Sequence, residues 1–217
     1  MIEVSGQAGA VRRQVGRRTL EAGEMDTVLI SQVYDAPAGD VWDACTSAER
    51  IPRWFLPVSG DLRPGGRYQL EGNAGGTIED CEPPHRFTAS WEFGDQVSWI
   101  EVRVSAEPGG GTRLEIEHLF PAGGAQWAEF GPGAVGVGWD MALLGLANHL
   151  ASGAAVDRQE AAAWTASAEA RQFITDTSDR WGEAAVASGT PAAAARAAAQ
   201  RVTAAYTGQP APGAGQD

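Results

Sequence analysis

Residues 134–150, AVGVGWDMALLGLANHL, are the strongest indication of how this chain folds. It carries a single charged residue, Asp140, and a run of short segments rich in β-forming residues precedes it. A helix that is apolar on almost every side has to be surrounded by other elements of the protein. We therefore expect the preceding strands to wrap this helix, which predicts an α+β fold built to enclose something.

Glycines inside this predicted helix indicate that other groups pack closely against it. Gly136, Gly138 and Gly145 each cost about 1 kcal/mol relative to alanine in a helix interior. Such residues are expected beside a hollow or at a close approach, and we favour the close approach. One stripe of the helix is formed by Val135, Trp139, Leu143, Leu146 and Leu150. Asp140 falls off this stripe, so we expect it on the solvent-facing flank.

The region before the helix reads as one antiparallel meander. Turn signals rich in Gly and Pro recur at about 8 to 12 residues, a spacing typical of consecutive short strands. The predicted strands are 26–34, 66–71, 76–82, 85–93, 97–106 and 112–120. Between the first two strands, residues 38–46 predict a short helix and 47–55 a second helical turn limited by Pro52.

Alternation along the last three strands assigns their faces, because successive side chains of a strand point to opposite sides. The inward set is Phe87, Ala89, Trp91, Phe93, Ile100, Val102, Val104, Leu114, Ile116, His118 and Phe120. The opposite face carries mostly Arg and Glu and is expected to be solvated. Trp99 falls on this polar face, where another segment of the chain could dock.

The remaining segments predict a chain in four parts. Residues 1–25 read as a mostly irregular lead-in, and 26–152 as the strand-and-helix domain. Residues 157–207 are alanine-rich and predict a helical hairpin, 168–188 and 191–206, with Ser167 as N-cap. The end, 208–217, is expected to be disordered. The hairpin has few apolar residues, so we expect it to pack on the polar face around Trp99 or to form a homodimer contact.

Composition and charge exclude several classes of protein. The net charge is −12, and residues 26–156 hold seven Arg against eighteen acids, which argues against a nucleic-acid partner. The chain has no Lys, so lysine nucleophiles and Schiff bases are excluded. The sequence shows no secretory signal and no stretch that could span a membrane, so we expect a cytoplasmic protein.

The sequence contains few patterns that are typical of catalytic or metal-binding sites. His85, His118 and His149 have no spacing that suits a metal, and we expect neither a metal nor a cofactor. Cys45 and Cys81 are expected to be buried thiols without a disulfide. No catalytic set of residues emerges, so we expect binding and no enzymatic activity.

Four segments together resemble a known family. They are YDAPAGDVWDACTSAERIPRWFLP (34–57), GDLRPGGRYQLE (60–71), TRLEIEHLF (112–120) and GWDMALLGLANHL (138–150). Their order is similar to that of the bacterial branch of the family of activators of Hsp90 ATPase, in the START-like (SRPBCC, Bet v 1-like) superfamily. The resemblance covers 26–152 and implies the helix-grip fold, with a mostly apolar cavity between a curved antiparallel sheet and the long C-terminal helix.

The function that we expect is the binding of a small apolar or aromatic molecule in this cavity. Its predicted ligand-binding residues are Trp54, Phe55, Tyr68, Trp91, His118, Phe120, Trp139 and Leu143. Aromatic residues at strand spacing are also typical of a core, so each of them alone could simply fill the interior. Two alternatives stay open. One is a protein-interaction module with a chaperone partner of the Hsp90 type, and the other is a polyketide-type cyclase or hydrolase that uses His118 and Asp140.

Overall fold

The structure is a computed structural model that describes residues 4–210. The described chain divides into two compact units. Unit 1 comprises residues 31–120 and 142–156, and unit 2 comprises 4–30, 121–141 and 157–210. One strand and one long helix run from one unit into the other, and each unit is described by itself below.

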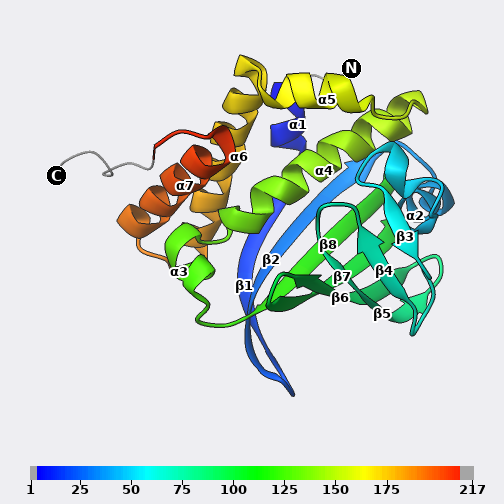
Figure 1. The fold of residues 1–217 in the computed structure, drawn as a ribbon, viewed down its shortest axis with the longest axis horizontal. Helices are drawn as coiled ribbons and strands as arrows, with labels where there is room; N and C mark the ends of the chain where they lie inside the picture. The colour runs from blue at the N-terminus through cyan, green and yellow to red at the C-terminus, as the bar shows by residue number, and fades with distance from the viewer. Residues whose placement is uncertain (1–3, 211–217) are drawn as a thin grey trace. The chain divides into compact units, whose positions relative to one another are not determined.

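Eight strands form one sheet, and six of them follow one another as a meander (Figure 1). The strands are β1 (Arg12–Leu20), β2 (Gly23–Tyr34), β3 (Val58–Gly60), β4 (Arg67–Leu70), β5 (Gly75–Glu82), β6 (Arg86–Phe93), β7 (Gln96–Ala106) and β8 (Thr112–Pro121). Their order in the sheet is β1-β2-β8-β7-β6-β5-β4-β3, and the pairs from β3 to β8 are antiparallel. This confirms the predicted meander and adds β3, which the sequence did not suggest.

The register of the meander confirms most of the predicted inward face. Phe93 is the exception, because it lies at the turn between β6 and β7 and is 58% exposed, so the expectation that it points into the core is wrong. Ile100 pairs with His118 and with Ala89 on its two sides, and all three are buried. On the other face, Arg103 forms ion pairs with Glu101 and Glu117. Trp99 also lies on that face, half-buried, and its indole donates to Glu79 (3.0 Å).

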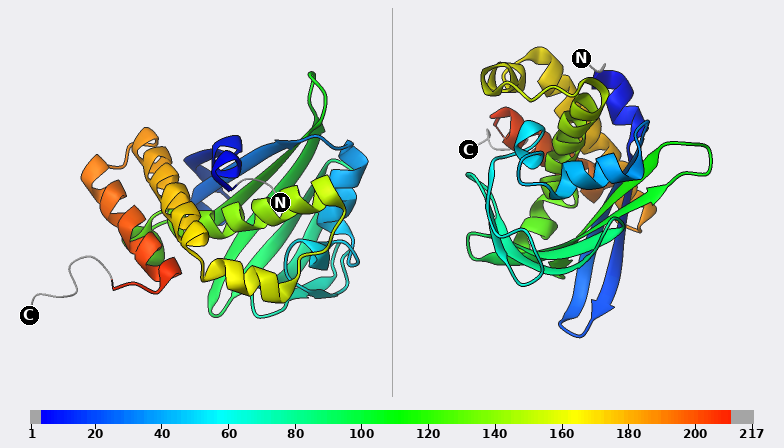
Figure 2. Two further views of the ribbon diagram at one scale, coloured as in Figure 1. Left: turned by 90° about the horizontal axis from the view of Figure 1, so that it is seen from above. Right: turned by 90° about the vertical axis from the view of Figure 1, so that its right-hand side faces the viewer.

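Unit 1 adds the helices α2 (Ala38–Thr46) and η1 (Ile51–Arg53) and the C-terminal half of α4 (Gly133–Ser152) to the sheet. In Figure 2 this half of α4 lies over one face of the sheet. Arg50 joins these helices, because its guanidinium donates to Asp40 (2.8 Å) on α2 and to His149 Nε2 (3.1 Å) on α4. Gly145 lies directly against the carbonyl of Trp54, so the expected close approach to the helix is confirmed here.

Unit 2 corrects the prediction of an irregular lead-in. Residues 1–25 contain α1 (Val4–Ala10) and the edge strand β1, and β2 begins at Gly23. The strand was missed because RRQVGRRTL carries few apolar side chains, as suits an edge strand that is largely solvated. Its strand conformation depends on pairing with β2 in the sheet, and no local sequence pattern predicts that pairing.

The tail of unit 2 forms the predicted helical hairpin. Its helices are α6 (Ala168–Ala187) and α7 (Ala192–Thr207), which lie side by side (Figures 1 and 2). Two short helices, α3 (Ala125–Phe130) and α5 (Arg158–Thr165), were not predicted. The Ser167 side chain accepts from the backbone N–H of Ala170, which confirms it as the N-cap of α6. Residues 208–210 are described, whereas the rest of the end predicted to be disordered lies outside the described residues.

A buried ion pair holds the lead-in, α4 and the tail together within unit 2. Arg13 on β1 donates from Nε to Asp140 Oδ2 (3.1 Å), and the Trp181 indole of α6 donates to the same oxygen (2.8 Å). Arg13 also donates to the carbonyl of Ala8 (3.1 Å) in α1 and to that of Val11 (3.0 Å), which directly follows this helix. Asp140 is 1% exposed, so the expectation that it lies on a solvent-facing flank is wrong. The helix buries it because Arg13 supplies the compensating charge.

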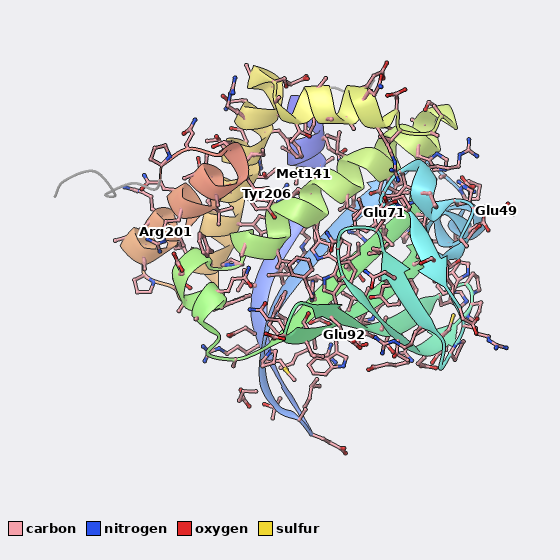
Figure 3. All side chains as sticks on the ribbon, viewed as in Figure 1. Glu49, Glu71, Glu92, Met141, Arg201 and Tyr206 are labelled. Carbon is pink, nitrogen blue, oxygen red and sulfur yellow. The ribbon has the colours of Figure 1, made fainter. Side chains whose placement is uncertain are left out.

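Small residues let the tail approach α4. Gly136 lies directly against the Trp181 ring, where a Cβ would overlap the indole. Tyr206, labelled in Figure 3, donates its hydroxyl to the Ala134 carbonyl (2.9 Å). The tail therefore packs on α1, β1 and the first half of α4 inside unit 2. Whether it also docks near Trp99 or forms a homodimer stays a prediction. No helix in residues 4–210 is long and apolar enough to cross a membrane.

Candidate functional site

A cluster of rings around His118 lies on the inner face of the sheet in unit 1. We call it the His118 cluster, and it consists of His118 and Phe120 on β8, Trp91 on β6 and Ser98 on β7. The imidazole stacks on Phe120, with ring centroids 4.2 Å apart, and meets the edge of Trp91 at 5.6 Å. Alternation brings these side chains to one face, because Trp91 pairs with Ser98 and Ile100 pairs with His118.

The hydrogen bonds of the cluster fix how His118 is protonated. The Ser98 hydroxyl donates to the Trp91 carbonyl (3.0 Å) and lies 2.9 Å from His118 Nε2. Since that hydroxyl has only one hydrogen, it accepts from the imidazole, which therefore carries its proton on Nε2. The other ring nitrogen, Nδ1, is then an acceptor.

Burial keeps this histidine neutral. His118 is 1% exposed, and desolvation lowers its pKa from 6.5 to about 3. At neutral pH the side chain is an uncharged imidazole that can polarise or orient a neutral group. A role as general acid is disfavoured, because the proton that an acid would donate is bound only under strongly acidic conditions.

Trp91 and Phe120 are partly exposed, in contrast to the histidine between them. A half-buried ring next to a buried polar group offers an apolar surface and a nearby hydrogen-bonding partner. Ligand sites combine mostly apolar walls with a few fixed polar groups in this way. The His118 cluster is the part of the predicted site that the structure brings together.

Trp54 and Phe55 form a second group, at the end of η1. Their rings stack with centroids 5.4 Å apart, and the Trp54 indole donates to the Ala44 carbonyl (2.8 Å). Trp54 is 8% exposed, and Gly145 of α4 contacts its backbone. These contacts pack the end of η1 against α2 and α4. A ligand role for the pair stays a prediction.

Tyr68, Leu143 and Trp139 lie in three other places. The Tyr68 hydroxyl donates to the Ser90 carbonyl (2.8 Å), one residue before Trp91, and burial raises the pKa of this phenol. Leu143 is fully buried in the half of α4 that belongs to unit 1. Trp139 belongs to the half of α4 in unit 2, so its place in the site stays a prediction.

Ser98 is the residue of the cluster that sequence reasoning missed. The alternation that turned Ile100, Val102 and Val104 inward also turns Ser98 inward, so a signal for it was present. It was overlooked because a single serine in a strand carries no motif. Its hydrogen-bond partner is His118, which follows it by 20 positions.

The other candidate chemistry of the chain is held in structural contacts. Asp140, which was considered as an acid or base with His118, is bound by Arg13 and Trp181 in unit 2. Burial raises the pKa of its carboxyl, and the Arg13 guanidinium counteracts part of that rise. Burial also raises the pKa of the Cys45 thiol to about 12, which suppresses its thiolate. No group of His, Cys, Asp and Glu residues in 4–210 is arranged to hold a metal.

Comparison with known proteins identifies the family. Residues 35–151 match the family described as activator of Hsp90 ATPase homolog 1-like protein, which is more than half of the chain. The chain belongs to this family. The predicted resemblance and the helix-grip fold are thereby confirmed, and the START-like superfamily is implied.

Solved structures extend the similarity beyond the matched segment. The crystal structure of CalU16 from Micromonospora echinospora is 40% identical and covers 81% of this chain and 98% of its own, with a TM-score of 0.65. The solution NMR structure of CalU16 is 35% identical over 92% of this chain and 94% of its own, with a TM-score of 0.63.

A more distant structure shares the fold alone. Protein MLL2253 from Mesorhizobium loti is 19% identical over 58% of this chain and 96% of its own, with a TM-score of 0.51. No curated protein matches the chain. The similarity to CalU16 therefore extends beyond residues 35–151, because it covers 81% and 92% of the chain in the two structures.

Proposed function

We propose that this protein binds a small apolar or aromatic molecule in a cavity between the inner face of the sheet and the C-terminal half of α4, without catalysing its conversion. The observation that carries the proposal is the His118 cluster, in which a neutral, oriented imidazole lies between two partly exposed rings. Stacking on Trp91 and Phe120 supplies an apolar contact of the kind that aromatic ligands make. The imidazole and Ser98 supply the polar groups that orient a ligand.

The chemistry of the cluster favours a neutral ligand. With a pKa of about 3, His118 carries no charge at neutral pH that could bind a carboxylate or phosphate. Most other inward residues of β6 to β8 are apolar, with Ala89, Ile100, Val102, Leu114 and Ile116 buried there. An ionised ligand would lose its hydration without gaining a partner of opposite charge in this cluster.

Two tryptophans on neighbouring strands provide a matched test. Trp91 lies on the inner face, and Trp99 lies on the outer face one strand away. Binding of the neutral fluorophore N-phenyl-1-naphthylamine would be titrated by its emission. We expect Trp91→Ala to weaken binding about tenfold or more, because the stacking surface is lost, and Trp99→Ala to change it less than twofold.

The polar part of the proposal has its own variant. Ser98→Ala removes the hydroxyl that orients His118 and is expected to weaken binding by several fold while the protein stays folded. Equal affinity in the parent protein, Trp91→Ala and Ser98→Ala would overturn the proposed site. Melting temperatures of each variant show whether a loss of binding reflects unfolding.

A second candidate function is interaction with an Hsp90-type ATPase, which is the activity named in the family description. The observation that favours it is an apolar tip on the β6–β7 hairpin, where Phe93 is 58% exposed and Val97 is 47% exposed. The test is stimulation of a purified Hsp90-type ATPase by this protein and by its Phe93→Ser, Val97→Ser variant. Stimulation that the double variant loses would support this function, and no stimulation by the parent protein would reject it.

A further inference from the structure

Whereas the His118 cluster belongs to unit 1, a cavity lies entirely within unit 2. Its volume is about 690 Å³, and it is lined by β1, the start of β2, α3, the start of α4 and the hairpin of α6 and α7. Most of the lining lies outside residues 35–151, the part of the chain that the family match covers. Cavities of roughly 300 to 1,000 Å³ are the usual size for small-molecule sites.

The alanine-rich composition of the tail explains how this cavity forms. Gly182 on α6 faces Ala195 and Ala199 on α7, so the two helices approach closely. These three residues line the cavity together with further alanines and glycines of the hairpin, and side chains this small leave it unfilled. The larger walls come from Trp127 and Phe130 on α3, which line the same cavity.

The walls of the cavity are almost without net charge. Arg17 and Asp26 are the charged residues that line it, and they pair with each other at 3.0 Å. The Asp26 carboxylate is buried, whereas the Arg17 side chain is 74% exposed, so the pair lies at an edge of the cavity. The pair has no net charge. Neither member is available as the partner of a charged ligand.

One buried hydroxyl in the lining lacks a partner. Ser178 on α6 is fully buried, and its Oγ is the single buried side-chain N or O atom without a hydrogen bond in the part of the chain that the structure describes. The neighbouring Thr177 hydroxyl donates to the carbonyl of Phe173 (2.8 Å), one turn before it. Ser178 makes no such bond, although buried polar groups nearly always do. Because Ser178 is one of the residues that line the cavity, a ligand group that reaches its Oγ would satisfy it.

We propose that unit 2 holds a second small-molecule site, which binds a neutral, mostly apolar molecule with one hydrogen-bonding group directed at Ser178 Oγ. The serine hydroxyl both donates and accepts, so a carbonyl, hydroxyl or N–H of the ligand suits it. The rings of Trp127 and Phe130 provide the apolar contact. This site is independent of the binding proposed for the His118 cluster.

A pair of related fluorophores tests the ligand class. N-phenyl-1-naphthylamine is neutral and has one N–H, whereas 1-anilinonaphthalene-8-sulfonate has the same rings and an added negative charge. We expect the full chain to bind the neutral probe at least tenfold more tightly at this site. Equal or tighter binding of the sulfonate here would overturn the assignment of a neutral ligand.

Filling the cavity tests its location. Ala194 and Ala198 line it from α7, one turn apart, whereas Ala193 and Ala197 lie beside them and do not. The double variant Ala194→Phe, Ala198→Phe is expected to abolish one class of neutral-probe sites, and Ala193→Phe, Ala197→Phe to leave it intact. The Trp91→Ala variant is expected to weaken binding at the His118 cluster and to leave this site unchanged, so the two sites are distinguished.

Ser178→Ala tests the hydroxyl. We expect affinity for the neutral probe at this site to fall about tenfold while the melting temperature stays the same or rises, because an unpaired buried group is removed. A hydroxyl with only a structural role would not separate these two measurements. Unchanged binding in both Ser178→Ala and the Ala194→Phe, Ala198→Phe variant would overturn the proposal, and unchanged binding in Ser178→Ala alone would overturn the role of the hydroxyl.

Discussion

A buried histidine lies in unit 1 and a buried carboxylate in unit 2, and the two units satisfy them by different means. His118 is neutral and is held by the Ser98 hydroxyl and two rings. Asp140 is held by the Arg13 guanidinium and the Trp181 indole. A neutral buried group can be replaced by an apolar one at small cost, whereas a buried charge that loses its partner cannot be satisfied. Single substitutions around Asp140 in unit 2 should therefore lower stability more than those around His118 in unit 1.

The largest effect is expected from Arg13→Leu. This change leaves the Asp140 carboxylate buried without its counter-charge and removes the bonds to the carbonyls of Ala8 and Val11, which should lower the free energy of unfolding by about 3 to 5 kcal/mol. Urea unfolding measures the loss, and Arg12→Leu is the control, because Arg12 is the exposed neighbour.

A double variant shows whether the unpaired charge is the cause. Arg13→Leu combined with Asp140→Leu should recover part of the stability that Arg13→Leu loses, since no isolated charge then stays buried. If the double variant is less stable than Arg13→Leu by the full effect of Asp140→Leu alone, the two residues are not coupled and the comparison between the units fails.

The next effects concern the glycines of α4, one in each unit. Gly136→Ala places a methyl group inside the Trp181 ring, and Gly145→Ala places one against the Trp54 carbonyl. Overpacking typically costs about 1 to 3 kcal/mol. A ring can turn aside more easily than backbone can move, so Gly145→Ala should be the more damaging substitution.

Gly138→Ala is the control for both glycine variants. A Cβ there would lie 3.3 Å from the Tyr206 hydroxyl, the far end of a side chain that can shift. The gain in helix propensity, about 1 kcal/mol, should then offset much of the contact. Thermal unfolding of the three variants gives their order, and equal losses at all three positions would show that helix propensity alone matters.

The sequence predicted those parts of the fold whose signals are local. Strands β4 to β8 combine alternation with Gly and Pro turns, and the long helix is nearly uniform in its apolar character, so each was visible in a short window. The edge strand β1 was missed because its conformation depends on pairing. The burial of Asp140 was missed because its partner, Arg13, lies 127 positions earlier.

The candidate site also has features that a local pattern predicts and features that depend on distant segments. The inward direction of Trp91, His118 and Phe120 followed from alternation. The tautomer of His118 depends on Ser98 in a neighbouring strand, and the hollow beside Ser178 depends on how α6, α7 and β1 pack. An alanine-rich helix predicts that small side chains face a neighbouring element, but it does not say which element. Contacts between distant segments therefore set the chemistry of both sites, and the sequence could not give them.

Acid should destabilise the protein through His118 of unit 1. The pKa of His118 is about 3 in the folded protein against an ordinary 6.5, so between these values the unfolded chain binds a proton that the folded chain does not. Stability is then full above about pH 6.5 and falls as the pH drops toward 3, by at most about 1.4 kcal/mol per pH unit.

The His118→Leu variant lacks this proton and isolates its contribution. Unfolding free energies of both proteins would be measured from pH 7 to pH 4, and the difference between them should move in favour of the variant as the pH falls. Carboxylates titrate in the same range in both proteins and cancel in the difference. A difference that does not depend on pH would mean that His118 is readily protonated in the folded state, and the neutral imidazole of unit 1 would then have to be abandoned.

The smallest effect is expected at the helix N-termini, where the two units also differ. In unit 2, Ser167 caps α6 with its side chain, whereas in unit 1 Pro37 precedes α2 without a side-chain cap. Ser167→Ala should lower the free energy of unfolding by about 1 kcal/mol, because the N–H of Ala170 loses its acceptor. Thr175→Ala inside the same helix is the control, since its hydroxyl bonds only back to the Arg171 carbonyl and alanine is the better helix former. If Thr175→Ala costs as much as Ser167→Ala, the cap adds nothing specific, and the stability of the alanine-rich tail rests on Trp181 and its contacts with Asp140 and Gly136.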